Sequence, residues 1–230
     1  MVTQVPQPDR AKVDGATVYD QPEGVVMDAW MPIAWDTFVQ LIEQPKYRKC
    51  KAYYHNQKMR LETMPVGSDH GKEHLVLIMV IALFGICRNF ILDGRDNCTF
   101  RKVGHEEFQP DIAYYVGEKA NQIPKGTRIV DLDQYPLPDL VIEVADTTLN
   151  EDIGEKRLQY EDLGITEYWV WDVQGGKFIA FAIAADCSSR RIRTSNVLPG
   201  LELDLVETAL RRSWESDQSA VGQWLMQQWQ

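Results

Sequence analysis

The stretch Pro138-Asp139-Leu140-Val141-Ile142-Glu143-Val144-Ala145 places a carboxylate inside an otherwise apolar segment. Its nearly continuous run of branched apolar residues predicts a strand that is buried on both faces. An ionised carboxylate in such a strand is costly unless another group compensates its charge. Glu143 is therefore the first candidate for a functional side chain.

The segments that follow this strand indicate the class of fold. Residues 152–163 have the pattern of a helix, and residues 167–173 and 177–183 that of two strands joined by a hairpin at Gly175-Gly176. A helix between two buried strands makes a strand–helix–strand unit. We therefore predict an α+β fold in which a mixed central β-sheet is flanked by helices.

Hydrophobic periodicity and turn residues divide the rest of the chain. We expect a flexible N-terminal arm over residues 1–22, a core domain over 23–204, and a C-terminal helical tail over 205–230 that packs on the core. Within the core the patterns predict helices at 30–44 and 70–90, a hairpin at 52–64 that turns at His55-Asn56-Gln57, a turn at 93–97, and strands at 98–103, 111–116 and 139–145.

Composition is that of a soluble globular protein, with 44% hydrophobic and 25% charged residues. The four cysteines form no CxxC or CxxH pair, so we expect reduced thiols in a cytoplasmic protein and no zinc site of that type. The apolar run 75–87 is shorter than the roughly 20 residues of a membrane helix, so no membrane partner is expected.

A net charge of −10 disfavours nonspecific binding to nucleic acid, which depends on clustered basic residues. Local patches matter more than the total, however, and two basic stretches stand out. We interpret both as solvated faces. They comprise Lys46, Arg48, Lys49, Lys51, Lys58 and Arg60 in the first stretch, and Arg190, Arg191 and Arg193 in the second.

Three residues predict a catalytic metal site. Asp111 opens a strand as part of Pro110-Asp111-Ile112, Glu143 lies within its strand, and Lys156 follows on the next helix. Two carboxylates about 4 Å apart repel by about 4 kcal/mol at an effective dielectric of 20, which a bound cation relieves. Oxygen ligands without cysteine or paired histidine favour Mg²⁺ or Mn²⁺. Such an ion would activate water for hydrolysis.

Each of these residues also has a structural interpretation. Pro-Asp is common at turns and where strands begin, so Asp111 and Asp139 could each have only a structural role there. Glu143 would also be stable in a salt bridge with an arginine. Lys156 alone would be a solvated helix residue, and Tyr160, on the same helix face, a packing residue.

Further candidates lie before the apolar helix. His70 is either a metal or substrate contact at the helix start or an exposed loop histidine. Glu62 is either a third carboxylate of the site or a solvated residue at the end of a strand. We expect Glu73 and His74 on the polar side of the first helical turn.

These residues, in this order, resemble the PD-(D/E)XK nuclease superfamily, and more closely a transposon-associated bacterial family of restriction-endonuclease-like proteins that is expanded in cyanobacteria. The resemblance covers about residues 61–173. Its motifs are Leu61-Glu62-x-Met64-Pro65, Asp69-His70-Gly71, Gln109-Pro110-Asp111-Ile112-Ala113, Pro138 to Val144, and Asp152-x-x-x-Lys156-x-x-x-Tyr160-x-x-x-Gly164-x-x-Glu167-Tyr168-Trp169-Val170-x-Asp172.

The resemblance implies a restriction-endonuclease-like core with Asp111 and Glu143 as metal ligands, and with His70 and Glu62 as further ligands. The superfamily lysine stands two residues after the glutamate, where this chain has Ala145. In the closer family the lysine is displaced to the following helix, which implies that Lys156 takes its role. Asp146 departs from the serine- or threonine-rich turn usual at its position.

We therefore expect a Mg²⁺-dependent endonuclease that hydrolyses DNA phosphodiesters, with Mn²⁺ as the alternative ion. Two other functions remain open on the same residues. One is a catalytically inactive interaction module that forms a homodimer through the tail, where Trp214, Trp224 and Trp229 lie. The other is a hydrolase for a phosphoester other than DNA.

Overall fold

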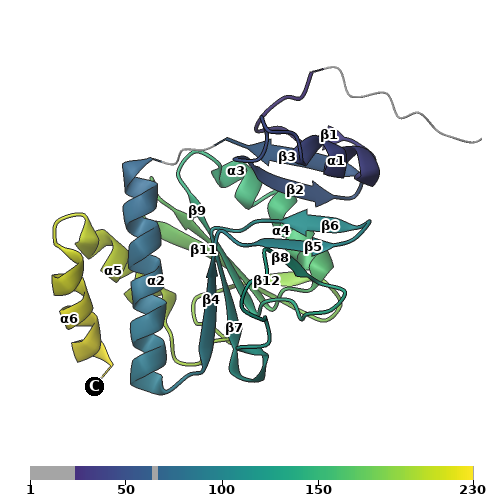
Figure 1. Cartoon of the computed structure of the whole chain (residues 1–230). Coiled ribbons are helices and arrows are strands. Elements are labelled where there is room, and N and C mark those ends of the chain that lie inside the picture. The colour runs from purple at the N-terminus through teal and green to yellow at the C-terminus, as the bar shows by residue number, and fades with distance from the viewer. Residues whose placement is uncertain (1–23, 64–66, 230) are drawn as a thin grey trace, which may run out of the picture.

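The computed structural model describes residues 24–63 and 67–229. The predicted arm at 1–22 lies outside these residues, as do Met64 and Pro65. Two six-stranded sheets form the framework, with helices packed around them (Figure 1). The predicted α+β class with mixed sheets and flanking helices is confirmed, but the strands are divided between two sheets.

The central sheet has the order β12-β11-β10-β9-β7-β4. β9 and β10 are parallel, as expected for a strand–helix–strand unit, and the other neighbours are antiparallel. The strands are β4 (Leu92–Asp96), β7 (Ile112–Val116), β9 (Leu140–Ala145), β10 (Glu167–Asp172), β11 (Lys177–Ile183) and β12 (Ser189–Ile192).

The N-terminal sheet has the order β1-β3-β2-β6-β5-β8, in which only β5 and β8 are parallel. The β2–β3 hairpin turns at Asn56 and Gln57, both of which have positive φ, as the twist of a two-residue hairpin loop requires. The strands are β1 (Met31–Pro32), β2 (Lys51–His55), β3 (Lys58–Glu62), β5 (Thr99–Lys102), β6 (Glu106–Phe108) and β8 (Ile129–Asp131).

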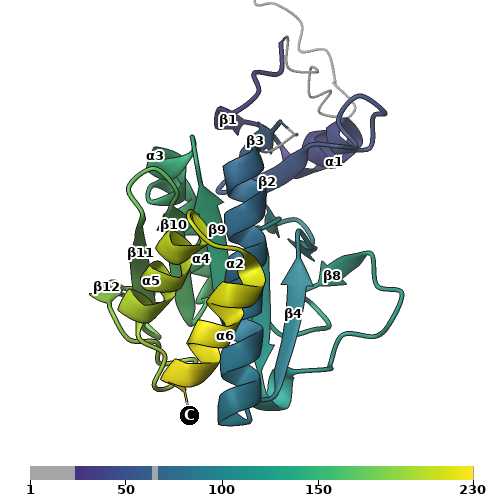
Figure 2. The ribbon, with the colours of Figure 1, turned by 90° about the vertical axis from the view of Figure 1, so that its left-hand side faces the viewer.

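Helices cover the two faces of the central sheet unequally. α2 (Ser68–Arg88) lies along one face, with α5 (Leu203–Ser213) and α6 (Gln218–Gln228) packed against it (Figure 2). α3 (Leu149–Asp152) and α4 (Glu155–Leu163) lie on the other face, beside the N-terminal sheet (Figure 1). α1 (Trp35–Ile42) packs on the N-terminal sheet, and the short 3₁₀ helix η1 (Gly117–Lys119) follows β7.

Alternation along β9 decides where Glu143 points. Leu140, Ile142 and Val144 belong to the core beneath α2, whereas Val141 and Ala145 belong to the core shared with α4 and the N-terminal sheet. Glu143 lies between the latter two and therefore faces the space between the two sheets.

Helix α2 is long and apolar enough to cross a membrane by length and composition alone, and half of its most apolar window is buried in the protein. Val76, Val80 and Phe84 are fully buried in the core that includes the C-terminal helices. This packing is typical of the core helix of a globular domain.

Several predicted boundaries are wrong. The expected turn at 93–97 is the edge strand β4, where an added Cβ on Gly94 would lie 2.9 Å from the ring of Tyr114, so this glycine serves close packing rather than a turn. The helix predicted at 152–163 begins only at Glu155, as α4, because Asp152 ends the separate helix α3 and the φ of −101° and ψ of −111° at Gly154 are not helical. The helix predicted at 30–44 begins only at Trp35, and β6, β8 and β12 were not predicted.

Candidate active site

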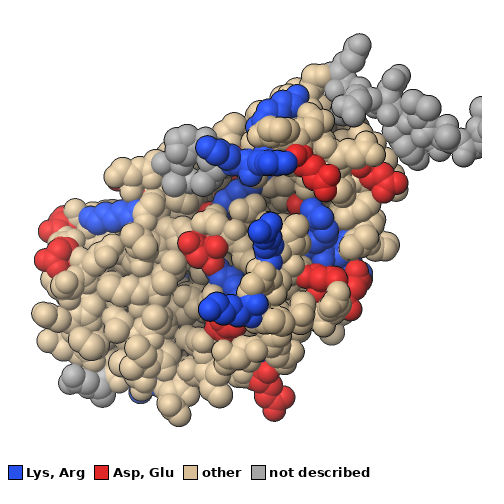
Figure 3. All heavy atoms as spheres, viewed as in Figure 1, with Lys and Arg blue, Asp and Glu red and all other residues tan. Residues whose placement is uncertain are grey.

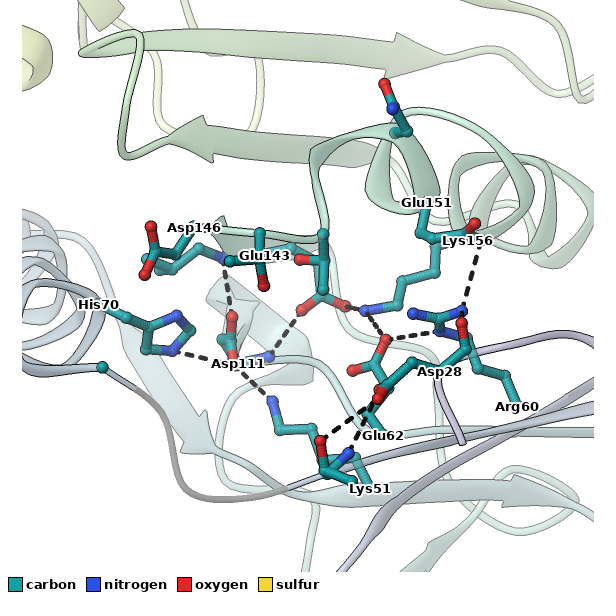
Figure 4. Close-up of a pocket in the computed structure, with 16 residues that line it drawn as sticks. Asp28, Lys51, Arg60, Glu62, His70, Asp111, Glu143, Asp146, Glu151 and Lys156 are labelled. Atoms are coloured by element: carbon teal, nitrogen blue, oxygen red, sulfur yellow. Dashed lines mark hydrogen bonds and ion pairs between the residues drawn. The ribbon is translucent and has the colours of Figure 1, made fainter. Parts of the chain in front are cut away.

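A cavity of about 600 Å³ opens between the two sheets. Lys51 and Glu62 line it from the N-terminal sheet, and Asp111, Glu143 and Lys156 line it from the central sheet and α4 (Figure 4). The structure thus brings the three predicted catalytic residues to one cavity. Their catalytic role stays a prediction.

Adjacent antiparallel strands hold the two central carboxylates together. β7 and β9 pair with Ile112 opposite Ile142, which places Asp111 beside Glu143. The backbone N–H of Val144 donates to Asp111 Oδ2 at 2.7 Å, and the N–H of Asp111 donates to Glu143 Oε2 at 3.3 Å. Among the described residues Glu143 has no arginine partner, so the interpretation as an arginine salt bridge is wrong.

Asp111 is a buried anion beside two basic side chains. Lys51 forms an ion pair with Oδ1, and His70 Nε2 lies 3.7 Å from the same oxygen. Burial acts to raise the pKa of Asp111, but Lys51 and His70 outweigh it and lower the pKa to about 2. Asp111 is therefore ionised throughout the physiological range.

The pKa of Glu143 shifts in the opposite direction from that of Asp111. It is only 2% exposed, and burial raises its pKa to about 8, a shift that the nearby Lys156 only partly opposes. Tyr160 donates its hydroxyl hydrogen bond to Glu143 Oε1 at 2.8 Å, and Tyr53 donates at 3.3 Å. Tyr160, which we interpreted as a packing residue, therefore also orients the central glutamate.

Lys156 is buried among acidic groups. Its Nζ lies 2.9 Å from Glu62 Oε1, 2.9 Å from Asp152 Oδ1 and 3.9 Å from Glu143 Oε1, and 4.4 Å from the centre of the Tyr53 ring. Burial alone would lower the pKa of Lys156, but these carboxylates raise it well above its usual value. The interpretation as a solvated helix residue is wrong, and this lysine is a permanent cation.

Glu62 and His70 are both part of the cavity wall. Glu62 is held by Lys156 and by Arg60, whose Nε lies 2.9 Å from Oε1. Burial raises the pKa of Glu62, but these cations lower it overall. His70 is 8% exposed, in the first turn of α2. The alternative interpretations of Glu62 as a solvated residue at the end of a strand and of His70 as an exposed loop histidine are therefore wrong.

Two neighbours of His70 on α2 differ from expectation. Glu73 and His74 are 2% and 8% exposed rather than on a polar face, because α5 covers this side of the helix and β4 approaches it. Glu73 accepts hydrogen bonds from the indole N–H groups of Trp171 and Trp214. Burial lowers the pKa of His74, so its imidazole is neutral.

Asp139 has a structural role, in agreement with the turn interpretation of its Pro-Asp pair. Its carboxylate accepts the backbone N–H of Val116 at 2.8 Å and lies 2.7 Å from the ammonium of Lys119. These contacts join the start of β9 to the end of β7, away from the cavity.

Four residues around the two carboxylates were not predicted as part of the site: Lys51, Tyr53, Arg60 and Asp152. The register of the β2–β3 hairpin contains a signal for three of them. In the register that the Asn56-Gln57 turn sets, Lys51 pairs with Glu62 and Tyr53 pairs with Arg60. These two pairs therefore share one face of the N-terminal sheet. A candidate Glu62 therefore implies a neighbouring Lys51.

The first basic stretch is consequently divided between surface and site. Lys46, Arg48, Lys49 and Lys58 are exposed, whereas Lys51 and Arg60 are buried against carboxylates. The second stretch is exposed, as expected. In Figure 3, basic and acidic side chains mix over the half of the molecule that carries the N-terminal sheet, and the half over α2 and the C-terminal helices carries few of either.

The donor set of the cavity fits a divalent cation. Asp111 and Glu143 present carboxylate oxygens, and His70 presents an imidazole nitrogen 3.7 Å from Asp111 Oδ1. Carboxylates suit Mg²⁺ and Mn²⁺, and imidazole suits the later first-row ions. Ligand atoms of His70, His74 and Asp111 all lie within 4.8 Å of one another, a spacing that an ion can bridge.

The α+β core with two carboxylates and a lysine at the junction of its sheets agrees with the arrangement that the resemblance to PD-(D/E)XK nucleases implies. The family model for Uma2, described as "Putative restriction endonuclease", matches residues 35–217, and the chain belongs to this family. No curated protein matches this chain.

A solved structure has a similar fold. The crystal structure of a "putative nuclease belonging to DUF820" from Anabaena variabilis superposes with a TM-score of 0.55 at 16% sequence identity. The match covers 78% of this chain and 99% of that one. This likeness shows that the two chains share an α+β fold.

Proposed function

We propose that this protein is a divalent-metal-dependent endodeoxyribonuclease that hydrolyses phosphodiester bonds at the cavity between its two sheets. The observation that supports this most strongly is the juxtaposition of Asp111 and Glu143, joined by hydrogen bonds across β7 and β9, with Lys156 Nζ 3.9 Å from Glu143. Membership of a restriction-endonuclease family supports a nuclease role and DNA as the substrate.

Asp111 and Glu143 would hold a Mg²⁺ or Mn²⁺ ion. When bound, such an ion activates water and neutralises charge that develops on a phosphoryl group. Asp111, ionised across the physiological range, supplies the permanent negative charge. The backbone N–H of Val144 keeps its carboxylate in place.

The lysines act as cations. The raised pKa of Lys156 keeps its amine protonated, so it serves to stabilise anions and does not accept a proton. Its Nζ lies 2.9 Å from Glu62 Oε1 and 2.9 Å from Asp152 Oδ1, which makes it a positioning residue for the carboxylates around Glu143. Lys51, which contacts Asp111, supplies a second cation beside the carboxylate pair.

A nicking assay tests the proposal. Purified protein is incubated with supercoiled plasmid and with single-stranded DNA, in Mg²⁺, in Mn²⁺ and in chelator. Wild type should nick DNA only with a divalent ion, and Asp111→Asn and Glu143→Gln should abolish nicking. Asp133→Asn, an exposed acidic residue away from the cavity, is the matched control and should nick at the wild-type rate.

The two alternative functions are outcomes of the same measurement. Hydrolysis of a small phosphodiester without nicking of DNA would indicate a phosphoesterase with another substrate. Absence of any metal-dependent hydrolysis would leave an inactive interaction module with a nuclease fold. Homodimer formation and a cytoplasmic location stay predictions, the first of which sedimentation measures directly.

A further inference from the structure

A pair of histidines on α2 lies beside Asp111. His70 and His74 are four residues apart, so their side chains project from the same face of the helix. Their ring centres are 6.0 Å apart, and His70 Nε2 is 3.7 Å from Asp111 Oδ1. One ligand atom from each of the three residues lies within 4.8 Å of the others.

His74 has a hydrogen-bonding capacity that the fold does not use. Its Nε2 is buried and has no hydrogen-bond partner among the described residues. Asp96 Oδ1 lies 3.0 Å away, but its direction does not complete a hydrogen bond, and the Asp96 side chain is 65% exposed. A buried polar nitrogen without a hydrogen-bond partner is costly, and a metal ion bound to His74 Nε2 would satisfy it.

The spacing suits a metal ion after a small adjustment. With bonds of about 2.1 Å, neighbouring ligand atoms on one ion lie about 3.0 Å apart in octahedral and about 3.4 Å apart in tetrahedral geometry. The 3.7 Å between His70 and Asp111 is close to these values. The remaining separations are all within 4.8 Å, so binding of one ion by all three residues requires the imidazoles to rotate toward it.

The chemistry of these donors differs from that of the Asp111–Glu143 pair. Two imidazoles and one carboxylate favour first-row transition ions, whereas Mg²⁺ binds almost entirely through oxygen. Glu62 does not contribute here, because Lys156 and Arg60 hold it on the opposite side of the cavity (Figure 4).

We infer that His70, His74 and Asp111 form a binding position for a transition-metal ion such as Mn²⁺, Co²⁺ or Zn²⁺, next to the Asp111–Glu143 pair and selective against Mg²⁺. The inference builds on the proposed function, since it assigns a class of ion to a carboxylate of the same cavity. Binding is measured without DNA, so failure of the nicking assay leaves it intact.

Metal titration of the full chain tests this position. Chelator-treated protein is titrated with Co²⁺, and binding is followed by calorimetry and by visible absorption, which responds to nitrogen ligands. We expect His70→Ala and His74→Ala each to weaken Co²⁺ binding at least about tenfold, as loss of a ligand should. Wild type should bind Mg²⁺ at least about tenfold more weakly than Mn²⁺.

Two control variants separate this position from its surroundings. His105→Ala removes an exposed histidine and should bind Co²⁺ as wild type does. Glu143→Gln alters the neighbouring carboxylate pair and should keep the Co²⁺ absorption that His74→Ala loses. Co²⁺ binding by His74→Ala within about twofold of wild type would overturn the inference, as would equal affinity of wild type for Mg²⁺ and Mn²⁺.

A measurement on wild type covers the case in which the variants fail to fold. The chain has four histidines, so their imidazole ¹⁵N resonances can be assigned individually. One equivalent of Zn²⁺ should shift a ring nitrogen of His70 and one of His74 while leaving His55 and His105 unchanged. Zn²⁺ shifts confined to His55 or His105, or their absence at His74, would contradict the inference.

Discussion

Lys51 and Asp111 form a buried ion pair between the two sheets, with each side chain only 6% exposed. The two residues are 60 positions apart in the sequence, and neither belongs to a helix. The ammonium of Lys51 therefore provides a cation at the carboxylate that we propose as the principal metal ligand. A bound ion and this ammonium must compete for, or share, the charge of Asp111.

Replacement of Lys51 by Met should make stability depend on metal. Removing one partner of a buried ion pair costs about 3–5 kcal/mol, because the other charge stays buried and unpaired. We expect that loss of unfolding free energy in chelator, and partial recovery on addition of Mn²⁺, which binds the folded state only. Urea denaturation with and without Mn²⁺ measures both. Lys58→Met, which removes a half-exposed lysine 3.6 Å from Glu155, should change little.

Replacement of Lys156 by Met should remove both stability and nicking activity, since Glu62 and Asp152 lose their shared cation. The expected loss of unfolding free energy is about 3–5 kcal/mol. Adding Glu62→Gln and Asp152→Asn to this variant removes the unpaired charges and should restore most of the stability but no activity. Wild-type nicking by the stable triple variant would show that Lys156 serves folding alone.

The metal-free protein should lose stability as pH rises, through Glu143. Its carboxyl loses a proton near pH 4.5 when unfolded but only near pH 8 when folded, so between these values the unfolded state binds fewer protons. Stability then falls by at most about 1.4 kcal/mol per pH unit. Asp111, with its pKa of about 2, does not titrate in this range.

Urea denaturation in chelator between about pH 5 and pH 8 measures this slope. Glu143→Gln has no titrating group at this position, so the difference between wild type and variant isolates the contribution of Glu143. Parallel stability curves for the two proteins would mean that the carboxyl ionises in the folded state at its ordinary pKa.

Removal of the Tyr160 hydroxyl should weaken the orientation of Glu143. Tyr160→Phe loses a hydrogen bond of 2.8 Å to Oε1, which should cost about 1 kcal/mol of stability and about tenfold or more in nicking rate. Tyr168→Phe is the matched control, because its equally buried hydroxyl donates to the backbone oxygen of Asp152 at 2.8 Å. It should lose similar stability but keep its nicking rate. Equal rates for both variants would exclude an orienting role for Tyr160.

The strand that carries Glu143 could be predicted because its signal is local. Apolar residues on both sides of the glutamate indicate burial on both faces, and alternation assigns Glu143 to the face of Val141 and Ala145. The same reasoning predicted β10 and β11 within a residue of their bounds. Membership of the nuclease-like class followed from motifs within this local pattern.

Edge strands and helix breaks were poorly predicted because their patterns are weak. β4 reads Leu-Asp-Gly-Arg-Asp, which has the composition of a turn, and only its pairing with β7 makes it a strand. The break between α3 and α4 was not predicted, although it falls at Gly154 and glycine disfavours a helix interior. At β4, pairing with β7 overrides local preference.

By itself the sequence determined the buried central strand, the acidic residue within it and the carboxylate that opens its neighbour, because each depends on burial patterns spanning only a few residues. Only the tertiary structure decided that Lys51 and His74 belong beside Asp111. Lys51 lies in a basic stretch typical of a surface, and His74 lies near the start of a helix. Neither sequence pattern indicates which residues face these side chains in the folded protein. Side chains from different sheets meet through strand register and sheet packing, which are properties of the folded chain as a whole.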